Sequence, residues 1–79
     1  MPRSTESPDW VLTRRRTIAT QIRAARVAAN LTQENVALTT GIDRATYNRI
    51  EQGHSAPLLD TLILIADAIG VPLSDLVRT

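Results

Sequence analysis

The chain has 79 residues, no cysteine, one histidine and a net charge of +1. This length suits one small domain, which buries roughly 60% of its unfolded surface on folding. Without cysteine there are neither disulfides nor thiolate ligands, and one histidine does not make a metal site. We therefore expect no metal and no cofactor, and stability that comes from apolar packing, helped by self-association.

The N-terminus lacks the apolar run of a signal peptide, and no stretch of about 20 apolar residues could span a bilayer. We expect a cytoplasmic protein without membrane contact. Its charge is uneven, because residues 1–54 hold eight arginines against five acids whereas residues 55–79 hold one against three. Such asymmetry is typical of a domain that turns one face towards phosphates, and random scatter is the alternative.

Hydrophobic periodicity predicts an all-helical protein, with residues 8–79 as one domain and residues 1–7 as a flexible arm. The first helix is expected over about residues 8–29. Ser7 is the candidate cap at its start, and Asn30 is a candidate left-handed residue at its end. Apolar residues at helical spacing predict its inner face: Val11, Ile18, Ile22, Ala25 and Ala29.

Four shorter helices are expected at about residues 33–39, 43–52, 58–69 and 72–77. The residues suited to their boundaries are Thr32 and Asp43 as N-caps, and Gly41, Gly53 and Gly70 as terminators. Asn35 stands where an acid would complete a reciprocal capping box with Thr32, so we expect that box to be weakened. The short connections predict one compact helical bundle.

Residues 33–52 have the pattern of a helix-turn-helix. Ala37 is small where two helices approach closely, and Gly41 allows the sharp turn between them. Tyr47 and Ile50 are expected to anchor the following helix to the core. This geometry holds one helix out from the body, so that its N-terminal residues can enter the major groove of DNA.

With these features the sequence resembles the phage-repressor and Cro-type helix-turn-helix family, also called the xenobiotic-response-element (XRE) family, over about residues 18–77. The matching residues are Leu31-Thr32-Gln33-Glu34, Val36-Ala37, Gly41-Ile42, Arg49-Ile50-Glu51-Gln52-Gly53, Pro57, Leu62, Ile65-Ala66, Ala68-Ile69-Gly70-Val71 and Asp75-Leu76. The resemblance implies a five-helix, lambda-repressor-like fold and sequence-specific binding of double-stranded DNA.

The resemblance also implies roles for individual residues. Base contacts are implied for Arg44, Ala45, Asn48 and Arg49, and phosphate contacts for Thr32, Gln33, Thr46, Gln52 and His54. The chemistry suits base contact, because Arg pairs with guanine, Asn with adenine, and an Ala methyl with the thymine methyl. The alternative for Arg49 is a solvated side chain bonded to the second helix. An ion pair between Arg26 and Glu51 is implied, which would tie the first helix to the third.

Leu58 and Leu64 are apolar where this family usually has polar residues. With Leu59, Ile63, Leu73 and Val77 they predict an exposed patch. From it we expect a homodimer through the last two helices, with two recognition helices about 34 Å apart on an inverted repeat. The alternative is that these residues complete the monomer core. The run Arg14-Arg15-Arg16 cannot share one surface, because successive residues are about 100° apart around a helix. A solvated face is expected there, with one of the three able to reach a flanking phosphate.

We expect a transcriptional regulator, a repressor in the first place, located on the nucleoid when bound to DNA. It could be free-standing, a restriction-modification controller, an antitoxin, or the DNA-binding domain of a longer protein. The alternative class is a protein-interaction module of the same fold, against which Arg44 and Arg49 argue. An enzyme is not expected, because there is no nucleophile–base pair, no phosphate-binding glycine loop and no metal-ligand spacing. No small-molecule ligand is expected.

Overall fold

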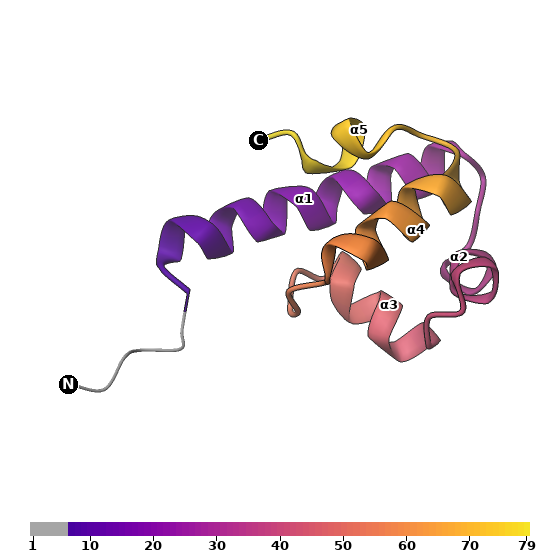
Figure 1. Ribbon diagram of the computed structural model, residues 1–79, viewed down its shortest axis with the longest axis horizontal. Helices are drawn as coiled ribbons and strands as arrows, with labels where there is room; N and C mark the ends of the chain where they lie inside the picture. Colours follow the sequence, from indigo (N-terminus) through magenta and orange to yellow (C-terminus); the bar gives the residue numbers. More distant parts are fainter. Residues whose placement is uncertain (1–6) are drawn as a thin grey trace.

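The computed structural model describes residues 7–79, which form five α-helices (Figure 1). They are α1 (Asp9–Ala28), α2 (Gln33–Thr40), α3 (Arg44–Glu51), α4 (Leu59–Ile69) and α5 (Leu73–Val77). No strand occurs within this range, and the all-helical fold predicted from the sequence is confirmed. Each helix end differs by at most one residue from its expected position. Apart from Ser7, the arm predicted over residues 1–7 lies outside the described residues.

Helix α1 is the longest of the five and has its main contacts with two of the others, α5 and α3 (Figure 1). Helix α5 packs on one side of α1 and α3 packs on another, while α2 contacts both α3 and α4. The C-terminal half of α1 lies within this group of helices, and its N-terminal half extends beyond it. The fold therefore consists of a compact body of helices and a projecting first half of α1.

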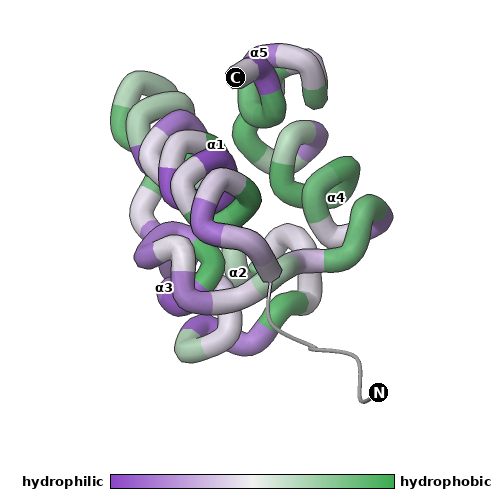
Figure 2. The backbone as a smooth tube through the Cα atoms, turned by 90° about the vertical axis from the view of Figure 1, so that its left-hand side faces the viewer, coloured by the Kyte–Doolittle hydropathy of each residue, from purple (hydrophilic) through white to green (hydrophobic). Residues whose placement is uncertain are grey.

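The hydrophobic core draws residues from all five helices. Its largest fully buried side chains are Ile22, Val36, Tyr47, Ile65 and Leu76. The predicted inner residues Val36, Ala37, Tyr47 and Ile50 are all buried, as expected. Ala29 was wrongly placed on the inner face of α1, because it lies at the C-cap, beyond the last turn, and is exposed. Figure 2 shows that α3 is largely hydrophilic whereas α4 is largely hydrophobic.

Two predictions about helix starts were wrong. Ser7 does not cap α1, because the helix begins one residue later, Pro8 occupies the N-cap position and no side chain caps it. At α2, the reciprocal capping box expected to be weakened is complete. The Thr32 hydroxyl accepts a hydrogen bond from the Asn35 backbone N–H at 3.0 Å, and Asn35 Oδ1 accepts one from the Thr32 N–H at 2.9 Å. An amide oxygen serves here as well as a carboxylate, because the box needs only an acceptor at this position.

The turn between α2 and α3 is built from local interactions. Gly41 takes φ 76°, a left-handed conformation that costs little for a residue without Cβ. The Thr40 hydroxyl donates to the Val36 carbonyl at 2.8 Å and accepts from the Ile42 N–H at 3.3 Å. Asp43 then caps α3 by accepting from the Thr46 N–H at 3.2 Å. The turn therefore fixes both the end of α2 and the direction of α3.

Candidate nucleic-acid interface

Helix α3 has one buried face and one exposed face. Tyr47, Ile50 and Glu51 are buried. With about 100° between successive residues, the side opposite these three carries Ala45, Asn48, Arg49 and Gln52. This outer face holds three polar side chains and one small apolar one, which is a suitable surface for a groove of DNA.

Three of the four residues predicted to contact bases, Ala45, Asn48 and Arg49, lie on this outer face, whereas Arg44 lies at the start of α3 on the side towards α2. Arg44, Ala45 and Arg49 are exposed, and Asn48 is half-buried. Residues 7–79 contain one ion pair, between Arg26 and Glu51, so neither Arg44 nor Arg49 takes part in one. Both guanidinium groups are therefore free to bind an external partner.

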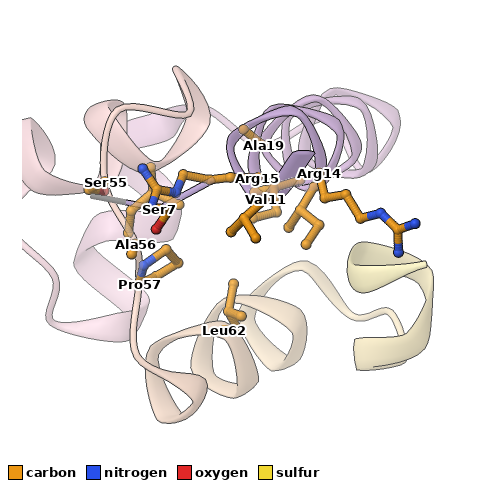
Figure 3. Close-up of a pocket in the computed structure, with 12 residues that line it drawn as sticks. Ser7, Val11, Arg14, Arg15, Ala19, Ser55, Ala56, Pro57 and Leu62 are labelled. Carbon is orange, nitrogen blue, oxygen red and sulfur yellow. The ribbon is translucent and has the colours of Figure 1, made fainter. Parts of the chain in front are cut away.

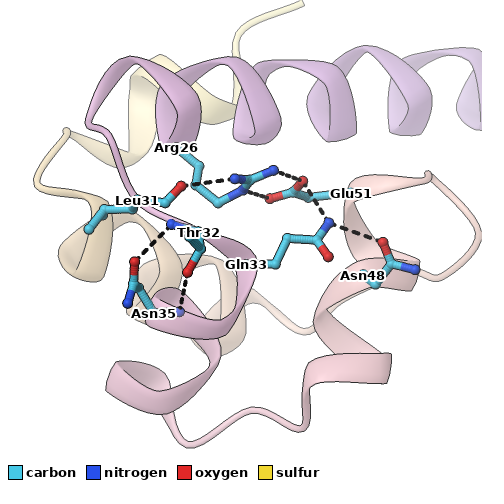
Figure 4. A network of polar contacts seen from close by, with 7 residues as sticks. All are labelled: Arg26, Leu31, Thr32, Gln33, Asn35, Asn48 and Glu51. Atoms are coloured by element: carbon cyan, nitrogen blue, oxygen red, sulfur yellow. Dashed lines mark hydrogen bonds and ion pairs between the residues drawn. The ribbon is translucent and has the colours of Figure 1, made fainter.

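The side chain of Gln33 joins the start of α2 to α3 (Figure 4). Its Nε2 donates to Asn48 Oδ1 at 3.0 Å and to Glu51 Oε1 at 3.1 Å. The family resemblance implied a phosphate contact for both the backbone N–H and the side chain of Gln33; in this structure the side-chain amide donates to these two protein oxygens. The bond sets the orientation of Asn48, whose amide nitrogen points away from Gln33 in Figure 4.

An ion pair between Arg26 and Glu51 connects α1 to α3 at the back of this network. Arg26 Nε lies 2.7 Å from Glu51 Oε2, and Nη2 lies 3.0 Å from Oε1. The two side chains are 12% and 2% exposed. Arg26 Nη1 also donates to the Leu31 carbonyl at 2.9 Å, so the same guanidinium fixes the connection between α1 and α2.

The charge state of Glu51 follows from these contacts. Burial alone would raise its pKa, but the hydrogen bonds from Arg26, with Tyr47 and Gln33 as further polar neighbours, outweigh burial and lower it. The pKa of Arg26 is raised, chiefly by its hydrogen bond to Glu51. Both groups are therefore charged over the whole physiological pH range.

Tyr47 lies fully buried beside this pair. Its hydroxyl has no well-formed hydrogen bond within residues 7–79. Burial raises the pKa of Tyr47, and the neighbouring Glu51 carboxylate raises it further. The residue therefore acts as a neutral core side chain, as its position in the predicted pattern indicated.

The other residues predicted to contact phosphates lie around the ends of α2 and α3. Thr32 is exposed, although its hydroxyl is engaged in the capping box. Thr46 is exposed in the first turn of α3, and Gln52 and His54 are exposed just after its last turn. Gln52 belongs to the exposed face of α3, and the other three lie at the ends of α2 and α3.

Arg23 was not among the contact residues predicted from the sequence. This exposed residue of α1 lines a shallow hollow together with Gln33, Asn48 and Gln52, next to the predicted base-contacting residues. Its spacing of three residues from Arg26 is the signal that could have found it, because residues three apart are neighbours on a helix surface.

The predicted dimer residues fall into two groups. Leu58 and Leu64 are 75% and 49% exposed. Leu73 and Val77 are partly buried and pack against the core of their own chain. The large apolar side chains that remain exposed in this region lie at the start of α4 and along it. We call them the α4 patch: Leu58, Leu59, Ile63 and Leu64.

A model of the helix-turn-helix family HTH_3 matches residues 22–76, which is well over half of the chain. The chain belongs to the Cro/C1-type helix-turn-helix (XRE) family. The family and fold predicted from the sequence are thereby confirmed. Members of this family are DNA-binding transcriptional regulators and not enzymes.

Proteins similar to this XRE-family chain include a phage transcriptional repressor and a restriction-modification controller protein. It is 39% identical over 59 residues to the cryptic phage CTXphi transcriptional repressor RstR of Vibrio cholerae; the match covers 75% of this chain and about half, 53%, of that repressor. Its fold is similar to the restriction-modification controller protein C.AhdI of Aeromonas hydrophila, with a TM-score of 0.78 and 25% identity over 81% of this chain and 97% of that one.

A second similar structure is an HTH_3 family transcriptional regulator from Vibrio cholerae. The TM-score is 0.76 at 29% identity, covering 82% of this chain and 36% of that chain. Within residues 7–79, no helix combines the length and apolar character needed to cross a membrane. The same residues contain no group of three or more His, Cys, Asp or Glu side chains that could hold a metal ion.

Proposed function

We propose that the chain is a sequence-specific repressor that inserts α3 into the major groove of double-stranded DNA. The observation that carries this proposal is the exposed face of α3, where Ala45 and Arg49 are open to solvent and Asn48 is oriented by Gln33. Arg44 is exposed beside this face, at the start of the helix. Arg44 and Arg49 supply donors for guanine, and each good bidentate pair discriminates by roughly 1–3 kcal/mol against the wrong base.

Phosphate contacts would position this helix on the duplex. We assign them to Thr46 at the start of α3, to Gln52 and His54 after it, and to the region of Thr32 and Gln33 at the start of α2. For Gln33 the backbone is the candidate contact, since its side-chain amide is used inside the protein. A regulator of this kind works where the DNA is, in the cytoplasm and on the nucleoid.

We further propose that the chain binds an inverted repeat as a homodimer, through the α4 patch. Support comes from the exposure of Leu58, Leu59, Ile63 and Leu64, because several large apolar side chains exposed on one short segment are typical of an interface. Two-fold pairing of this surface would present two α3 helices to two half-sites one helical turn apart. Assignment as a repressor is supported by the similarity to the phage repressor RstR.

Selection of bound duplexes from a random pool tests the proposal. We expect enrichment of a short inverted repeat, and binding that weakens steeply as salt rises. Arg44→Ala should relax base choice at one position per half-site. Arg78→Ala, which removes an exposed arginine beyond α5, is the matched control and should leave the selected sequence unchanged. A pool without enrichment, or an unchanged base preference in Arg44→Ala, would contradict the proposed readout.

A further inference from the structure

We propose that Arg16 and Arg23 of α1 form a second phosphate-binding surface, which holds the DNA backbone beside the groove entered by α3. The inference rests on the proposed function and extends the DNA contact to α1, with one arginine from each half of that helix. Arg16 precedes the family match at residues 22–76, so this surface includes a part of the chain that the family pattern does not cover.

Arg23 lies directly beside the α3 face. It borders the hollow lined by Gln33, Asn48 and Gln52, and its side chain is exposed. The neighbouring acid, Glu51, already forms an ion pair with Arg26 one turn further along α1. The charge of Arg23 is therefore not matched by a carboxylate within residues 7–79.

Arg16 lies against the loop that follows α3. A Cβ added to Gly53 would come within 3.2 Å of Arg16 Cγ and 3.4 Å of its Cα, so the stem of Arg16 packs on the backbone next to Gln52 and His54. Arg16 and Arg23 are seven residues apart on one helix, which places them on the same side and about 10 Å apart along the axis. Together they form a basic row beside the exposed end of α3.

The other two arginines of the run face elsewhere. Arg14 stacks over the Trp10 ring at 5.6 Å, and its Nη1 lies 3.3 Å from Thr79 Oγ1, beyond α5. Arg15 lines a cavity of about 340 Å³ between α1, the loop before α4, and α4 itself. Figure 3 shows Arg14 extending towards α5 and Arg15 extending the other way, towards Ser7 and Ser55. Of the three, Arg16 is the one whose stem packs on Gly53, directly after the end of α3, whereas Arg15 reaches towards Ser55 further along the same loop.

The charge pattern of the sequence supports the same surface. Between Asp9 and Glu34 the chain has five arginines and no acidic residue. One of them, Arg26, is neutralised by Glu51. An uncompensated basic helix surface next to a groove-binding helix has the chemistry that a phosphate backbone requires.

Fluorescence anisotropy with the selected duplex, measured over a range of salt concentrations, tests the inference. For B-DNA, removing one phosphate-binding cation reduces the slope of log K against log[salt] by about 0.9. The double variant Arg16→Gln/Arg23→Gln should therefore lower the slope by about 1.8 for each bound protomer, and by about 3.6 for a homodimer on the selected inverted repeat, with the selected base sequence unchanged. Arg14→Gln is the matched control from the same helix, and its slope should equal that of the natural chain.

Restoring the charge separates binding from folding. Arg16→Lys/Arg23→Lys should recover the natural slope, because a lysine ammonium also binds phosphate as a point charge. Three results would each overturn the inference while leaving α3 readout intact. They are an unchanged slope in Arg16→Gln/Arg23→Gln, a decrease of the slope in Arg14→Gln as large as in that double variant, and a slope in Arg16→Lys/Arg23→Lys that stays reduced. Failure of the natural chain to select any duplex would instead overturn the proposed function, and this inference with it.

Discussion

The side-chain amide nitrogen of Gln33 lies 3.0 Å from Oδ1 of Asn48, so the first residue of α2 orients a residue on the outer face of α3. Because Asn48 Oδ1 accepts from Gln33, its amide nitrogen is directed away from Gln33 (Figure 4). The helix-turn-helix therefore sets more than the angle between its two helices. It also determines which atoms of Asn48 are presented to a partner.

Gln33→Ala should weaken binding to the selected duplex although Gln33 need not touch a base. The released Asn48 amide loses its fixed orientation, so we expect a decrease in affinity within the roughly 1–3 kcal/mol of one base contact. A double-mutant cycle with Asn48→Ala, measured by anisotropy, checks the mechanism. The two decreases should be strongly non-additive, and simple additivity would show that Gln33 acts independently of Asn48.

Arg26→Met should destabilise the fold strongly, because it leaves the Glu51 carboxylate buried without its partner. Removing one member of a buried pair costs about 3–5 kcal/mol. Arg26→Met/Glu51→Met should be more stable than the single variant, since no unpaired charge is left. Urea unfolding of both, with the exposed Arg23→Met as control, measures this. A double variant that is no more stable than Arg26→Met would contradict the explanation.

Protonation of Glu51 at low pH should lower the free energy of unfolding. Its pKa is lowered in the folded state, so its contribution to stability is fully present above the unfolded pKa of about 4.3 and is lost as pH falls through the folded pKa. The difference in unfolding free energy between the natural chain and Glu51→Gln should therefore be largest above about pH 5 and shrink below about pH 4. A difference that stays constant from about pH 7 to about pH 2.5 would show that the charge of Glu51 is not responsible.

Tyr47→Phe should keep or slightly raise stability near neutral pH. The hydroxyl is buried without a well-formed partner, and removing such a group relieves a desolvation penalty. The raised pKa also makes a prediction at high pH, because stability linked to Tyr47 is present below about pH 10 and lost as pH rises above it. Tyr47→Phe should thus become increasingly more stable than the natural chain above about pH 10. A clear decrease in the stability of Tyr47→Phe at neutral pH would instead show that the Tyr47 hydroxyl forms a strong hydrogen bond to Glu51.

Leu58→Gln/Leu64→Gln should abolish self-association with little change in monomer stability, because both side chains are exposed. Sedimentation measured up to high micromolar concentration checks this. The matched control is Val27→Gln/Leu38→Gln, which removes two exposed apolar residues outside the α4 patch and should leave the dimer intact. A natural chain that remains monomeric over this range would end the dimer proposal.

Much of the fold could be predicted because its signals are local in the sequence. Helical spacing of apolar residues placed five helices, and Gly41 and Asp43 marked the turn through backbone conformation and capping. These features depend on residues a few positions apart, where steric and hydrogen-bonding rules act directly. The position of Arg26 opposite Glu51 came from the family resemblance, and the structure contains that pair.

The tertiary structure alone decided which side chains meet across helices. Spacing could not show that Gln33 would bond to Asn48, that Arg16 would pack on Gly53, or that Leu73 would join the core while Leu58 stays exposed. Each outcome depends on how far one helix is rotated and shifted against another. That rotation is set by the packing of the whole core, to which residues distant in the sequence contribute together.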